Sequence, residues 1–136
     1  MLNVQCSIVK SREMPEEKKK YDLEDRLVEY SCRMIDVVEA LPSTRAGNYI
    51  AGQLIRCCLS PAFNYGEVQG AESRNDFIHK LGVVLKECRT ALKIIRLKEM
   101  IKPVKRIDEI FKETEELIAI VAKSIDTANK NRKIVL

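Results

Sequence analysis

Apolar side chains recur every three or four residues along most of this chain, and this spacing restricts what the chain can fold into. The first steps run from Leu23 to Leu27 and on to Tyr30, which keeps the three side chains on one face of a helix. Four segments carry this pattern: residues 22–41, 44–70, 74–101 and 103–129. No stretch alternates apolar and polar residues as a half-buried strand would. The sequence therefore predicts an all-α protein.

Connections of only a few residues join the four predicted helices. Short connections between long amphipathic helices favour antiparallel neighbours. We therefore expect residues 21–136 to form an antiparallel, up-and-down four-helix bundle, which is one domain for a chain of 136 residues. Residues 1–20 precede the first periodic segment and are expected to form an irregular arm.

Residues that begin or end helices mark the predicted boundaries. Either Ser43 or Thr44 can cap the second helix, and Gly70 is expected to end it. Ser73 is expected to open the third helix in a spacing that resembles a capping box. Pro103 fits the first turn of the fourth helix.

The chain has five cysteines, an odd number, and no two of them form a Cys-x-x-Cys pair. Cys32, Cys57, Cys58 and Cys88 lie within apolar helical patterns. We expect free thiols that act as small apolar side chains, as is usual in a reducing cytoplasm. No apolar run approaches the roughly 18 residues that a membrane span needs. We therefore expect a cytoplasmic protein that binds no membrane.

The chain offers few residues for catalysis or metal binding. His79 is the only histidine, whereas zinc usually takes three or four protein ligands and a di-iron bundle needs a histidine on each of two helices. No Gly-x-Ser-x-Gly turn and no glycine-rich phosphate loop occur in the sequence. We therefore expect a protein without enzymatic activity, cofactor or metal.

Basic residues cluster in the third helix and in the connection that follows it. Residues 86–106 carry eight Lys and Arg against two Glu, a net charge of +6. The helical spacing places four of the eight on one stripe beside the apolar face, where they can follow a phosphate backbone. The alternative is a solvated helix face that acids on neighbouring helices partly neutralise. The predicted nucleic-acid contacts are Lys86, Arg89, Lys93 and Arg96, supported by Lys102, Lys105 and Arg106.

The third and fourth helices carry more apolar residues than one buried stripe uses. Ile94, Leu97, Met100 and Ile101 widen the face of the third helix, and Ile120 adds to the fourth. A four-helix core consumes one stripe per helix. The apolar residues beyond this stripe predict contacts between subunits, so we expect a homo-oligomer.

Residues 53–87 resemble the motif of a known family. They read QLIRCCLS at residues 53–60, NYGE at 64–67 and NDF at 75–77. This set is similar to that of bacterial four-helix-bundle proteins encoded in intervening sequences of 23S rRNA genes. The resemblance implies a bundle without enzymatic activity that assembles as a pentameric ring. It also implies kinship with accessory proteins of diversity-generating retroelements, which bind nucleic acid and a reverse transcriptase through basic surfaces.

The residues of this motif, including Phe77, can be interpreted physically. Pro61 inside a helix costs roughly 3 kcal/mol and is expected to kink or break the second helix. Asn64 and Glu67 can satisfy backbone groups freed near Pro61 or pair across a subunit interface. Arg56 is a candidate buried or interface cation, and the alternative for all three polar residues is an ordinary surface position.

Two functions follow from the sequence. The first is a non-enzymatic oligomeric bundle that binds the backbone of RNA or DNA weakly and non-specifically through a basic face. The alternative is a structural scaffold that binds a protein partner and no nucleic acid.

Overall fold

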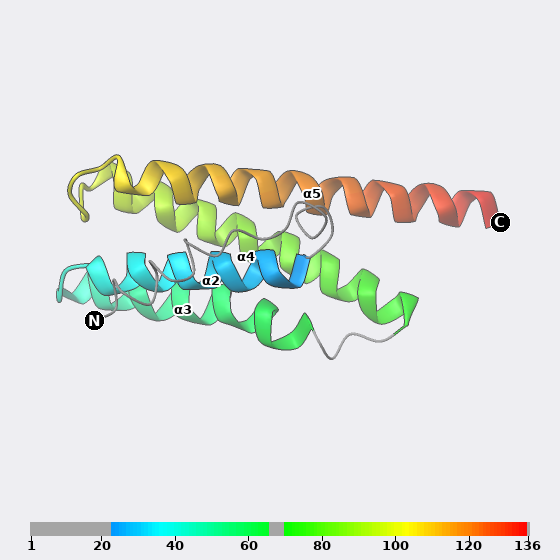
Figure 1. Cartoon of the computed structure of the whole chain (residues 1–136), viewed down its shortest axis with the longest axis horizontal. Coiled ribbons are helices and arrows are strands. Elements are labelled where there is room, and N and C mark those ends of the chain that lie inside the picture. The colour runs from blue at the N-terminus through cyan, green and yellow to red at the C-terminus, as the bar shows by residue number, and fades with distance from the viewer. Residues whose placement is uncertain (1–22, 66–69, 136) are drawn as a thin grey trace.

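The structure is a computed structural model that describes residues 23–65 and 70–135. These residues form four helices (Figure 1): α2 (Leu23–Ala40), α3 (Arg45–Tyr65), α4 (Ala71–Leu97) and α5 (Arg106–Val135). The described residues include no strand. Each helix packs against the next one in the chain, and α2 also meets α5. The predicted all-α four-helix bundle is confirmed, while the predicted arm of residues 1–20 lies outside the described residues.

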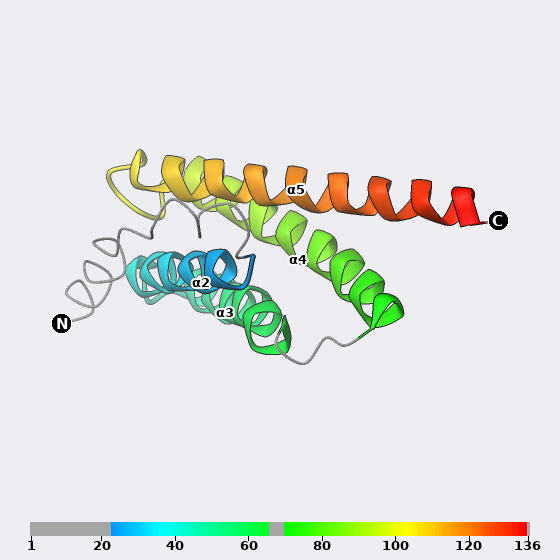
Figure 2. The same cartoon turned by 45° about the vertical axis from the view of Figure 1, so that its right-hand side comes forward.

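The chain turns back between α2 and α3 and again between α4 and α5. Figures 1 and 2 place both connections at the same end of the molecule. In both views α5 lies along α4 and extends past the other helices at its C-terminal end. No helix of the described chain is long and apolar enough to cross a membrane.

The core follows the apolar stripes that define the four predicted segments. Fully buried side chains come from every helix, among them Met34, Leu54, Leu92 and Leu117. Three polar hydroxyls lie among these side chains, and each has a hydrogen-bond partner. They belong to Tyr30, Ser31 and Thr114.

The start of α3 is capped as the sequence suggests. Of the two candidates, Thr44 is the cap, because the Gly47 N–H donates a hydrogen bond to Thr44 Oγ1 at 3.0 Å. Gly47 is buried against the preceding connection, and a Cβ added there would clash with the carbonyl oxygen of Pro42.

The boundary between α3 and α4 differs from the prediction. The helix continues through Pro61, which is buried, so a break at this residue is wrong, while the kink expected as the alternative stays a prediction. Gly70 does not end α3: it is the N-cap of α4, with a φ of 81° that favours glycine. Ser73 therefore lies within the first turn of α4, and α4 has no side-chain cap hydrogen bond.

The connection between α4 and α5 is longer than predicted, and α5 itself ends later. The Lys98 and Glu99 N–H groups donate to carbonyls of the last turn of α4, and Glu99 has a φ of 50°, so the helix ends before Ile101. Ile101 is nevertheless buried, because it packs into the core from the connection. Pro103 accepts a hydrogen bond from the Arg106 N–H in a turn before α5 begins.

Candidate functional site

Half of the predicted basic stripe on α4 faces α5. Arg89 Nη1 lies 3.6 Å from Glu115 Oε1, and Arg96 Nη2 lies 3.3 Å from Asp108 Oδ1. Exposed ion pairs of this kind stabilise a protein by at most about 1 kcal/mol. They nevertheless engage two of the side chains that were predicted to contact phosphate. The alternative, a helix face that neighbouring acids partly neutralise, predicts such pairs.

The other predicted nucleic-acid contacts are exposed and form no ion pair within the described residues. Three of them border two different hollows. Lys86 lines a cavity between α3 and α4, whereas Lys105 and Arg106 line a cavity between α2 and α5. The structure thus separates basic residues that are close in sequence. The five exposed residues are Lys86, Lys93, Lys102, Lys105 and Arg106.

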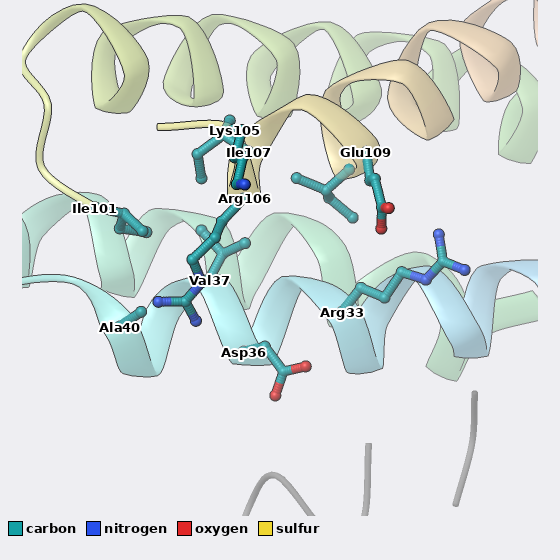
Figure 3. Close-up of a pocket in the computed structure, with 10 residues that line it drawn as sticks. Arg33, Asp36, Val37, Ala40, Ile101, Lys105, Arg106, Ile107 and Glu109 are labelled. Atoms are coloured by element: carbon teal, nitrogen blue, oxygen red, sulfur yellow. The ribbon is translucent and has the colours of Figure 1, made fainter. Parts of the chain in front are cut away.

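The hollow between α2 and the start of α5 is a cavity of about 360 Å³ (Figure 3). Buried apolar side chains line its floor, among them Val37, Ile101 and Ile107. Charged side chains of both signs surround this floor. They are Arg33, Asp36, Lys105, Arg106 and Glu109.

Sequence reasoning missed three of these charged residues. Arg33 and Asp36 are three residues apart and each directly precedes a buried residue of α2, so both lie at the edge of its apolar stripe. Their position at the edge of the stripe could have been recognised from the sequence. Glu109 has the same signal, because it directly precedes the buried Ile110 of α5.

The other hollow, which Lys86 borders, runs along α3 and α4. It consists of a cavity of about 610 Å³ and another of about 700 Å³, and Val83 lines both. We call the former the apolar groove. Its apolar lining is Tyr49, Ile50, Leu54, Cys57, Val83, Cys88, Ala91 and Ile94.

Exposed large apolar side chains are concentrated on the two helices that form this groove. Among the residues whose side chains the structure describes, α3 and α4 contribute three each, α2 contributes only Val28, and α5 contributes none. Ile101, which was expected to be surplus, is buried within the chain itself. The six on α3 and α4 are Tyr49, Ile55, Phe63, Val83, Ile94 and Leu97.

Two residues of the family motif pack beside the larger cavity. Pro61 is buried, and Phe77 is half-buried, and both line this cavity. The Phe77 ring meets the Tyr65 ring edge to face, with centroids 5.5 Å apart. These residues therefore hold the end of α3 against the start of α4.

The structure bears on part of the hypothesis for the polar residues of the motif, and their pairing across a subunit interface stays a prediction. Asn64 Nδ2 donates to Ser60 Oγ at 3.1 Å, a side-chain partner, and the structure gives it no bond to a backbone group freed by Pro61. Arg56 is exposed, so a buried cation is the wrong interpretation. Glu67 lies outside the described residues.

Cys57, Cys58 and Cys88 are free thiols, and burial makes these three poor nucleophiles at neutral pH. Burial, together with a hydrogen bond from Cys57 Sγ to Glu87 Oε2 at 3.2 Å, raises the pKa of Cys57 to about 11. Burial raises the pKa of Cys58 and of Cys88 to about 12. Within the described ranges, no group of three or more His, Cys, Asp or Glu is placed to hold a metal ion.

Comparisons with protein-family models, with curated proteins and with solved structures gave no match to this chain. The resemblance to the bundle proteins of 23S rRNA intervening sequences therefore stays a prediction. What the geometry offers is a basic cavity on one side of the bundle and an apolar groove on another.

Proposed function

We propose that this protein is an assembly module whose copies associate through the exposed apolar side chains of α3 and α4. The observation that carries this proposal is their uneven distribution: Leu97 is 82% exposed and Phe63 is 74% exposed, while α5 presents no such residue among its described side chains. Three of the exposed apolar side chains, Tyr49, Val83 and Ile94, line one groove, and contiguous exposed apolar surface is typical of interaction sites. Removing it from water stabilises a complex by about 25 cal/mol per Å².

A second copy of the chain suits this surface because charges of both signs lie beside it. Lys86 and Glu87 flank the apolar groove, and Asp76 and Lys80 line the adjoining cavity. Identical surfaces can meet across a symmetry axis when each carries both signs, since unlike charges then face each other. The family resemblance adds a ring of five copies to this proposal.

The test is the mass of the protein in solution, measured by light scattering during size-exclusion chromatography. Replacing Val83 and Ile94 together by Glu places two charges at the edge of the apolar groove and should reduce the oligomer to smaller species. Val28→Glu is the matched control, because Val28 on α2 is 45% exposed and Ile94 is 44% exposed. A wild-type protein that stays monomeric, or a control that dissociates equally, would contradict the proposal.

Binding to the backbone of RNA or DNA is a second candidate function. The observation in its favour is that Lys86 and Lys93 are both exposed on α4 and have no ion pair among the described residues. Lysines that lack a carboxylate partner are free to replace the counterions of a phosphate backbone.

Salt-dependent binding to duplex DNA distinguishes this candidate. Replacing Lys86 and Lys93 together by Gln should lower the slope of log affinity against log salt by roughly 1.8, since each phosphate contact contributes about 0.9. The control variant carries Gln at Lys112 and Lys123, two exposed lysines of α5. Equal losses in both variants would indicate a response to net charge rather than a binding surface.

A further inference from the structure

The cavity between α2 and α5 is lined by cations that form no ion pair with the described residues. Elsewhere on α5, carboxylates pair with arginines of other helices: Arg26 lies 3.0 Å from both Glu113 and Glu116. At the cavity the described residues form no such ion pair. Three cations and two carboxylates line the cavity, which leaves it a net charge of +1.

The cations approach the cavity from two sides. Figure 3 shows Arg106 reaching from the start of α5 towards α2, while Arg33 and Glu109 lie at the other end. Lys105 and Arg106 are chain neighbours and both line the cavity. Both residues therefore reach the cavity from the start of α5.

The backbone at the start of α5 does not supply the attraction for an anion. The N–H groups of Arg106, Ile107 and Asp108 already donate to carbonyls of the preceding turn. Any anion bound here is held by side chains.

The apolar floor and the volume restrict the size and character of a ligand. The four buried aliphatic side chains offer a surface for an uncharged group next to the cations. A volume of about 360 Å³ falls within the range of about 300–1,000 Å³ that is usual for small-molecule sites. The four are Val37, Ile101, Ile107 and Ile110.

We propose that this cavity binds a phosphate-bearing small molecule, with Lys105 and Arg106 contacting the phosphate and the apolar floor contacting its uncharged part. A phosphate group carries about −1.5 to −2 charges at neutral pH and has three acceptor oxygens, so it can accept hydrogen bonds from both of these cations, whereas a carboxylate carries one charge and two oxygens. The site lies on a different face from the apolar groove and does not depend on the assembly proposed above.

Thermal unfolding of the full chain, followed by circular dichroism, tests this site. The probes are adenosine monophosphate and inorganic phosphate, with adenosine as the probe without phosphate, all at one ionic strength set with sodium chloride. A ligand that binds only the folded protein raises the unfolding midpoint in a concentration-dependent way. We expect a saturable rise of a few degrees with the phosphate probes and none with adenosine.

Two double variants locate the effect. Replacing Lys105 and Arg106 together by Gln should abolish the rise. Replacing Lys98 and Lys102 together by Gln removes the same charge from the same connection, but neither residue lines the cavity, so the rise should remain. If the first variant unfolds early without a probe, Lys105→Gln alone serves the comparison, because the Lys105 side chain has no ion pair with a described residue.

The different probes also distinguish a phosphate ester from free phosphate as the ligand. A larger rise with adenosine monophosphate supports a phosphate ester whose body uses the apolar floor, and equal rises support free phosphate at the same cations. The proposal is overturned if no probe exceeds sodium chloride, if adenosine alone has the same effect, or if the control variant loses the rise as well.

Discussion

At the scale of single residues, two glycines of α3 have opposite surroundings. A Cβ on Gly47 would clash with the Pro42 carbonyl oxygen, whereas a Cβ on Gly52 would meet nothing within 4 Å. Both glycines lie in the same helix, where glycine is less favourable than alanine. The approach of the preceding connection, and not helix propensity, is therefore what requires glycine at position 47.

Alanine at each position should change stability in opposite directions. Gly47→Ala should lower the free energy of unfolding by about 1–3 kcal/mol, because the backbone must move to relieve the clash. Gly52→Ala should raise it by about 0.5–1 kcal/mol. Urea denaturation measures both, and a Gly47→Ala variant as stable as the wild type would show that the two segments do not approach this closely.

Thiol reactivity is a second expectation at this scale. Cys58 and Cys88 are buried, and their raised pKa values keep them protonated at neutral pH. Alkylation by iodoacetamide, located by peptide mass spectrometry, should therefore be slow in the folded protein and fast in denaturant. Rapid labelling of either residue in the folded protein would contradict the buried positions.

At the scale of elements, polar side chains connect α2 to α5 across the least extensive of the four helix interfaces. Tyr30 Oη and Thr114 Oγ1 lie 2.7 Å apart in the core. The Thr114 hydroxyl also lies 2.7 Å from the Ile110 carbonyl oxygen and donates to it. With that proton used, the Tyr30 hydroxyl donates to Thr114 Oγ1.

Removing the Thr114 acceptor alone should cost more than removing the Tyr30 donor alone. Thr114→Val leaves the Tyr30 hydroxyl without this acceptor and should destabilise the protein by about 1–3 kcal/mol, and Tyr30→Phe by about 1 kcal/mol. The double variant should lose less than the sum of the two. Thr90→Val is the control: the Thr90 hydroxyl makes the same bond to a preceding carbonyl but is exposed, so its effect should stay within about 0.5 kcal/mol.

The same scale shows what the sequence could predict. Apolar spacing identified the four helices, because burial of one stripe depends only on residues within a segment. It placed the end of α3 at Gly70 and the end of α4 at Ile101, and neither residue ends a helix in the structure. A glycine with positive φ suits the end of one helix or the cap of the next, and an isoleucine packs into the core from a helix or from a connection.

The candidate site was predictable only in part, for a related reason. The basic residues were evident from composition. Whether Arg96 faces solvent or Asp108 depends on how α4 is rotated against α5, and the cavity beside Arg33 depends on how α5 meets α2. These are relations between helices that no spacing within one helix determines.

At the scale of the whole molecule, the buried thiols connect stability to pH. An ordinary thiol has a pKa near 9, and the fold raises the pKa of Cys57 to about 11 and of Cys58 and Cys88 to about 12. The unfolded chain therefore releases these protons at lower pH than the folded chain does. Their contribution to stability is complete below about pH 9 and is lost as the pH rises towards 12.

The free energy of unfolding should accordingly fall between about pH 9 and about pH 12, measured by urea denaturation. Replacing Cys58 and Cys88 together by Ala should make this fall less steep, even though the variant starts from a lower stability at neutral pH. An unchanged steepness would assign the alkaline loss to other groups.

The length of α5 has a consequence of its own. Its 30 residues span about 45 Å, whereas the 18 residues of α2 span about 27 Å, and Val121 is its last buried residue among those whose side chains are described. Backbone amides up to Ile125, whose partly buried side chain still packs against the core, open together with the core, whereas those beyond it are held by the helix alone. Hydrogen–deuterium exchange should therefore divide this one helix into a slow part and a fast C-terminal part, and a fluorescent label attached to the fast part would report on the molecule without perturbing its core.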